Sequence, residues 1–123
     1  MKRPSYSELN QKIRQAKEAV STDRVFLFRP YLLAADAFEL GYQFSEILTL
    51  LRDLLEEIHP KDYAGQYPPQ RSYETEFFQS ELFPFAWMSK RLGCRVYWKF
   101  TLKEKELWII SLHQERKHIK KEE

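Results

Sequence analysis

The segment that most constrains the fold runs from Cys94 to His113, CRVYWKFTLKEKELWIISLH. In its first half, apolar residues alternate with polar and cationic ones, which is the period of a strand buried on one face. The apolar set is Val96, Trp98, Phe100 and Leu102, and the polar set is Arg95, Tyr97, Lys99, Thr101 and Lys103. The segment therefore predicts a β-hairpin with one face on a core. The other face presents cations around a tyrosine, as an RNA phosphate would require.

The turn of this hairpin decides which side chains share a face. The sequence LKEKEL has no Asn-Gly or Asp-Gly pair that would fix the turn type. With an odd number of turn residues, for example Lys103-Glu104-Lys105, Tyr97 and His113 would project from the same face. An even turn would separate them unless a bulge intervenes, so both registers stay open.

Charge is distributed unevenly along the chain. Residues 1–89 carry 10 Lys/Arg against 13 Asp/Glu, net −3, whereas residues 90–123 carry 10 against 5, net +5. A basic C-terminal third predicts an anionic partner, although a solvated surface is the alternative. The basic tail at 116–121, RKHIKK, would add affinity for a nucleic-acid backbone or is a frayed end.

Length and composition exclude several classes of protein. With 123 residues, 43% of them hydrophobic, the chain is expected to form a single domain with a real core. A single cysteine, Cys94, excludes an internal disulfide and any zinc site built on paired cysteines. The N-terminal residues are polar and the apolar runs are shorter than a membrane span, so we expect a cytoplasmic protein without membrane contact.

Motifs of the common cofactor-dependent enzymes are missing from the sequence. It has no phosphate-binding glycine loop, no His/Glu metal-binding helix and no Gly-x-Ser-x-Gly elbow. Its histidines, His59, His113 and His118, are too scattered to indicate a metal site. We therefore expect neither a metal nor a cofactor.

Helices are predicted for the N-terminal half. Ser5 and Glu8 fit a capping box ahead of a helix over about 6–20, and the run 25–28 reads as an edge strand. A second helix would run from Pro30 to about residue 40 and end at Gly41. Ser45 is expected to cap a third helix with an apolar stripe that we interpret as core. The stripe is Ile47, Leu48, Leu51, Leu54, Leu55 and Ile58.

The middle of the chain reads as a long loop. Residues 59–72, HPKDYAGQYPPQRS, contain three prolines and Gly65, and loops of this length are often functional. Propensity does not decide whether 74–83 is strand or helix. The order of elements predicts an α+β domain with N-terminal helices packed on a small, mostly antiparallel sheet.

Short motifs along the chain support a resemblance to a known family. They are Glu39-Leu40-Gly41 followed by Phe44 and Ile47, the aromatic residues before Gln79, Val96-Tyr97-x-Lys99, and Ile109-x-Ser111. Their order resembles the MqsR family of bacterial toxins over roughly residues 6–115. The resemblance implies a RelE-like fold and a ribonuclease that cleaves mRNA and is neutralised by an antitoxin protein, with the ribosome as a further candidate partner.

The resemblance also implies a set of site residues. Gln79 matches the family's glutamine and Tyr97 its tyrosine, while the lysine at the end of the last strand falls on His113. The family's loop lysine falls on Ala64, so Lys61 or Arg71 would have to take its place.

The chemistry of metal-free RNA cleavage suits these residue types. The 2′-hydroxyl must lose a proton, a dianionic phosphorane must be stabilised and the leaving 5′-oxygen must be protonated. His113 is the candidate for proton transfer, Tyr97 for orienting the phosphate or assisting transfer, and Gln79 for holding phosphate or base. The candidate RNA-binding cations are Arg95, Lys99, Arg71 and Lys61.

Alternative interpretations remain. A strand-end histidine is commonly a surface residue and a strand tyrosine a packing residue. Trp98 and Trp108 are expected in the core, whereas they or Tyr63 or Tyr73 could instead stack on unpaired bases. The competing function is a non-catalytic RNA- or protein-binding module, with the acidic helix at 45–58 meeting a basic partner.

Overall fold

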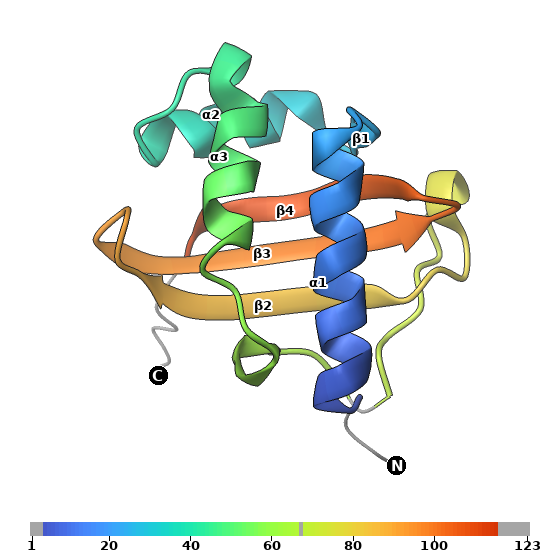
Figure 1. Cartoon of the computed structure of the whole chain (residues 1–123). Coiled ribbons are helices and arrows are strands. Elements are labelled where there is room, and N and C mark those ends of the chain that lie inside the picture. The colour runs from blue at the N-terminus through green and yellow to red at the C-terminus, as the bar shows by residue number, and fades with distance from the viewer. Residues whose placement is uncertain (1–3, 67, 116–123) are drawn as a thin grey trace, which may run out of the picture.

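Helices and a mixed sheet make up residues 4–66 and 68–115, the part of the chain that this computed structural model describes. The helices are α1 (Tyr6–Ser21), α2 (Pro30–Glu39) and α3 (Ile47–Leu55), with short 3-10 helices η1 (Phe44–Glu46), η2 (Pro60–Asp62) and η3 (Thr75–Phe77). The strands are β1 (Val25–Leu27), β2 (Leu82–Ser89), β3 (Cys94–Lys103) and β4 (Glu106–Gln114). Helices α1 and α3 cross one face of the sheet (Figure 1).

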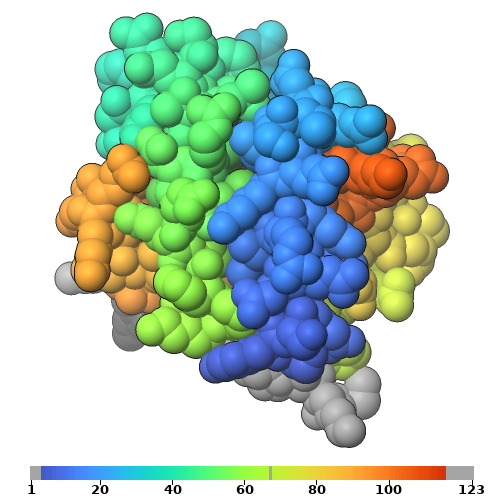
Figure 2. Space-filling view, viewed as in Figure 1, coloured from blue at the N-terminus to red at the C-terminus, as the bar shows by residue number. Residues whose placement is uncertain are grey.

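The sheet has the order β1-β4-β3-β2. The strand β1 pairs in parallel with β4, whereas the β2–β3 and β3–β4 pairs are antiparallel. The predicted α+β class with a mostly antiparallel sheet is thus confirmed, and β1 is the edge strand expected from residues 25–28. The space-filling view shows α1 and α3 side by side over the sheet (Figure 2).

Local signals account for the first two helices. The Glu8 backbone N–H donates to Ser5 Oγ at 3.0 Å and the Ser5 N–H donates to Glu8 Oε1 at 2.8 Å, so the predicted capping box is present. Helix α2 begins at Pro30 and gives way to Gly41, whose φ of 95° is the left-handed conformation that favours glycine.

The start of α3 differs from the prediction. Ser45 lies exposed inside η1 and does not cap the helix, so that prediction is wrong. The Gln43 backbone N–H instead donates to Glu46 Oε1 at 2.8 Å, which satisfies one N-terminal donor before the chain enters α3. The buried face of α3 and its extension is Leu50, Leu51, Leu54, Leu55 and Ile58, while Ile47 and Leu48 are only half-buried.

The core lies between the helices and the sheet. Trp98 and Phe100 of β3 and Phe85 of β2 are fully buried, and the Phe100 ring lies 5.3 Å from that of Trp98 and 5.7 Å from that of Phe85. Burying side chains of this size stabilises the fold by about 1.5–3 kcal/mol each. The strand alternation predicted for residues 95–103 is confirmed where Val96, Trp98 and Phe100 face the helices.

The segment between α3 and β2 is mostly loop, as predicted for 59–72. It contains η2 and forms isolated bridges from Tyr63 to Phe85 and from Arg71 to Glu81, which tie it to the outer side of β2. Residues 74–83 divide into η3 and the first residues of β2. No helix in the described ranges is both long and apolar enough to cross a membrane, and the basic tail at 116–121 lies outside those ranges.

Candidate nucleic-acid interface

The β3–β4 turn has an even number of residues. Lys103 pairs with Glu106, which leaves Glu104 and Lys105 as a two-residue turn, with φ values of 51° and 71°. Positive φ at both positions is typical of a type I′ turn, whose twist matches that of the strands. By itself this turn would place Tyr97 and His113 on opposite faces.

A β-bulge restores the common face. Phe100 pairs with Ile109 but Lys99 pairs with Ser111, so Ile110 is the extra residue of β4. Beyond the bulge, Tyr97 pairs with His113. Of the registers that the sequence left open, the even turn with a bulge is the one that this hairpin adopts.

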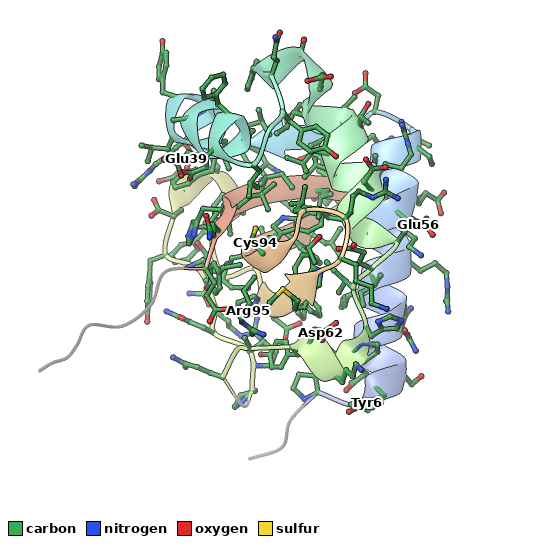
Figure 3. The ribbon with its side chains drawn as sticks, turned by 90° about the vertical axis from the view of Figure 1, so that its left-hand side faces the viewer. Tyr6, Glu39, Glu56, Asp62, Cys94 and Arg95 are labelled. Atoms are coloured by element: carbon green, nitrogen blue, oxygen red, sulfur yellow. The ribbon has the colours of Figure 1, made fainter. Side chains whose placement is uncertain are left out.

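Tyr97 and His113 lie on the face of the sheet that points away from α1 and α3, which we call the open face. In Figure 3 the α1 helix stands on one side and Arg95, which shares the open face, lies on the other. The two rings stack with centroids 5.4 Å apart and 26° between their planes. A stacked phenol and imidazole thus lie together at one point of the open face.

A hydrogen bond selects the tautomer of His113, and burial acts on Tyr97. His113 Nδ1 lies 2.8 Å from the Gln114 carbonyl oxygen, which can only accept, so Nδ1 donates and Nε2 is the basic nitrogen of the neutral ring. Burial raises the pKa of the Tyr97 phenol above its ordinary value of 10.0. Tyr97 therefore stays a neutral donor at physiological pH.

The cations of the open face differ in their partners. The Arg95 guanidinium binds Glu115 at 2.6 Å, and Lys103 Nζ donates to the Glu76 carbonyl at 2.8 Å. The Lys99 ammonium makes no hydrogen bond or ion pair with residues 4–66 or 68–115. Lys99, whose strand partner on β4 is Ser111, is therefore the open-face cation best able to meet an anion.

The other predicted residues are positioned differently. Gln79, at a φ of 68°, is held through its backbone, since its N–H donates to the Ser72 carbonyl and its own carbonyl accepts from Arg71 Nη1 at 3.1 Å. Lys61 lies in η2, which packs against α1. Figure 3 shows Asp62, the residue after Lys61, on the side of the sheet where α1 stands. The structure thus gathers Tyr97, His113 and Lys99 but leaves Lys61 on the helix-covered side of the sheet.

A small cavity of about 200 Å³ adjoins Lys99 and Tyr97. Its other walls are Leu82 and Pro84 of β2 and the loop residues Ala64, Gly65, Gln66 and Gln70. Gln70 is one of the polar residues of the loop 59–72 that the sequence offers as able to reach a ligand held by the sheet, whereas the sequence gives no sign of Gln66. Hydrogen bonds between the loop and β2 bring both glutamines to the open face.

The aromatic residues proposed for base stacking are largely occupied. Trp98 is in the core, and Trp108 lies between Phe26 and Phe77, with ring centroids at 5.1 and 5.4 Å. The expectation of a core position is confirmed for Trp98 and is wrong for Trp108, which is half-buried and packs against aromatic rings on the open face. Tyr63 is buried, whereas Tyr73 is 82% exposed.

The resulting set holds a basic imidazole nitrogen, a neutral phenol, an ammonium group and a small polar cavity. Such groups can accept a proton, donate a hydrogen bond and neutralise a phosphate.

No three His, Cys, Asp or Glu side chains within residues 4–66 and 68–115 gather as metal ligands would. No model of a known protein family matches the chain, and no curated protein matches it.

Proposed function

We propose that the chain is a toxin-like endoribonuclease that cleaves single-stranded mRNA in the cytoplasm without a metal and is held in check by an antitoxin protein. The observation that carries the proposal is the stacked Tyr97–His113 pair beside Lys99 on the open face. These three side chains supply the functions that in-line attack by a 2′-hydroxyl needs.

Each residue has a definite role in the proposed reaction. The 2′-hydroxyl gives its proton to Nε2 of His113 and attacks the adjacent phosphate, while Lys99 neutralises the charge on the non-bridging oxygens. The Tyr97 phenol protonates the leaving 5′-oxygen and regains a proton from the His113 imidazolium through solvent. The products are a 2′,3′-cyclic phosphate and a 5′-hydroxyl.

Incubation with a long single-stranded RNA in excess EDTA tests this function. Cleavage should yield the two ends named above, and an RNA methylated at every 2′-oxygen should stay intact because it lacks the nucleophile. If the folded protein cleaves neither RNA alone nor mRNA on translating ribosomes, the chain is instead a non-catalytic RNA- or protein-binding module.

The partner that we propose would bind an apolar surface of α2 and η1. Its large exposed residues are Tyr31, Leu32 and Phe38 of α2 and Phe44 of η1, with exposed fractions of 92%, 58%, 72% and 46%. Apolar groups gathered in this way are typical of protein interaction sites. The charged residues of the segment 30–51 are all acidic, namely Asp36, Glu39 and Glu46. Two copies meeting through this surface would bring like charges together, so we propose a different protein with an apolar and basic binding segment.

A double substitution tests this surface. Tyr31→Ser with Phe38→Ser should change the free energy of unfolding by less than about 1 kcal/mol in all, because both side chains are exposed. In cells, growth inhibition by this variant should no longer be relieved by the partner that relieves inhibition by the parent. Equal relief of both would contradict the placement of the partner on α2.

A further inference from the structure

The cavity beside Lys99 has no role in the proton transfers described above. We propose that it binds one unpaired nucleobase of the RNA, next to the phosphate held at Lys99 and Tyr97. This inference rests on the proposed function in that it assigns a specificity subsite to the same open face.

The size and the apolar wall of the cavity suit a single base. Its volume of about 200 Å³ is below the roughly 300–1,000 Å³ of sites for drug-sized ligands, so it can take one ring system and not two. Leu82 and Pro84 are buried residues of β2 that form one wall. An aromatic base can lie against such a wall with its edge directed at the loop.

The loop side of the cavity carries groups that read a base edge. Gln66 and Gln70 both line it, and each carboxamide offers one acceptor oxygen and two donor hydrogens. Paired donors and acceptors of this kind recognise unpaired RNA bases through their Watson–Crick and Hoogsteen edges. The cavity thus combines an apolar wall with two amides that can distinguish one base from another.

Three hydrogen bonds hold the loop in place before a ligand arrives. The Ala64 N–H donates to the Pro84 carbonyl at 2.9 Å, and the Leu82 N–H donates to the Gln70 carbonyl at 2.7 Å. The Tyr63 hydroxyl donates to the Gln66 carbonyl at 2.6 Å. Since these bonds fix the backbone at both glutamines, the loop backbone loses little conformational entropy when a base enters.

Gly65 makes this close packing possible. A Cβ atom at this position would lie 2.5 Å from the Tyr63 hydroxyl and 2.8 Å from Pro84 Cδ, both shorter than van der Waals contact. The shape of the cavity therefore depends on the missing side chain at position 65.

The position of the cavity connects it to the Tyr97–His113 pair. Tyr97 and Lys99 line it, and across β3 the same two residues pair with His113 and Ser111 of β4. A base held between the loop and β2 would place its own sugar and phosphate over β3. The nucleotide in the cavity is thus the one adjoining the cleaved bond.

Binding of strands that cannot be cleaved tests the subsite. Fluorescein-labelled DNA hexanucleotides of each single base, and an abasic hexanucleotide, lack the 2′-hydroxyl and report binding alone. We expect one homopolymer to bind more tightly than the others, and Gln66→Ala with Gln70→Ala to weaken it about tenfold, within the range of a bidentate base contact. Binding of the abasic strand should not change.

The matched control is Gln15→Ala, because Gln15 is an exposed glutamine on α1, and it should not change the affinity for any of these strands. Equal weakening of the abasic strand, no effect of the two substitutions, or no binding by the parent would overturn the subsite. Cleavage by the parent, together with binding that the double substitution leaves unchanged, would refute the subsite alone. Binding that depends on the two glutamines, without any cleavage, would instead refute the ribonuclease proposal alone.

Discussion

Removal of the Glu57 carboxylate should destabilise the fold by taking away a hydrogen-bond acceptor of buried side chains. Glu57 follows α3, and its Oε1 accepts from Trp87 Nε1 at 2.9 Å while its Oε2 accepts from the Arg91 backbone N–H at 3.0 Å. Trp87 is only 5% exposed, so Glu57→Ala leaves its indole N–H buried without an acceptor, at a cost of about 1–3 kcal/mol. The Arg91 N–H lies in an exposed turn where water can replace the carboxylate, so we expect a total loss near 2 kcal/mol.

Urea unfolding followed by far-ultraviolet circular dichroism measures this loss. The matched control is Glu56→Ala, because the Glu56 carboxylate lies 4.0 Å from Lys17 Nζ with both side chains exposed. Exposed pairs of this kind contribute about 1 kcal/mol at most, so the control should unfold close to the parent. Equal losses in the two variants, or none in Glu57→Ala, would refute the reasoning.

The same carboxylate should make stability depend on pH. Burial raises the pKa of Glu57, but hydrogen bonds from Trp87, Ser89 and the Arg91 N–H together outweigh it and lower the pKa below its ordinary value of 4.5. The unfolded chain then binds more protons than the folded one, so the contribution of Glu57 is present above the ordinary pKa. It is lost as the pH falls through the lowered value. The stability difference between the parent and Glu57→Gln should therefore shrink on acidification, and a constant difference would contradict this.

Three further predictions concern the loop and the open face. Thr101→Val should cost about 1–2 kcal/mol in thermal unfolding, because the buried Thr101 hydroxyl donates to the Glu81 carbonyl at 2.6 Å. An unchanged melting temperature would contradict that contact. Gly65→Ala should cost about 1–3 kcal/mol through the clash with Tyr63, and a variant as stable as the parent would show that the loop is not closely packed. In an ultraviolet titration, the difference between the parent and Tyr97→Phe reports the ionisation of the Tyr97 phenol, which should occur above pH 10.0. Ionisation at or below that value would argue against the burial of Tyr97.

The elements that sequence reasoning predicted are those fixed by neighbours in the chain. The capping box at Ser5 and Glu8 and the glycine at position 41 act within a few residues, so their patterns are readable directly. The alternation at 95–103 fixes which residues of β3 face the core because a strand has a strict period of two. The expected Ser45 cap does not form because Gln43 and Glu46, which flank Ser45, bond to each other and enclose it in η1.

The parts that were not predictable depend on distant contacts. The run Trp108-Ile109-Ile110 is apolar throughout, so it gave no sign of which residue the bulge would leave unpaired. Yet that bulge decides whether His113 joins Tyr97. The cavity glutamines likewise depend on hydrogen bonds between the loop and β2, which no local pattern encodes.

The most direct test of the central claim is the rate at which His113→Ala cleaves single-stranded RNA in excess EDTA, compared with the parent and with His59→Ala. His59 is an exposed histidine beside η2, so its substitution should leave the rate unchanged. The proposed proton transfer predicts a loss of at least about a hundredfold for His113→Ala, the scale that general acid–base groups contribute. Equal rates for the folded His113→Ala variant and the parent would contradict the assignment of catalysis to the Tyr97–His113 pair.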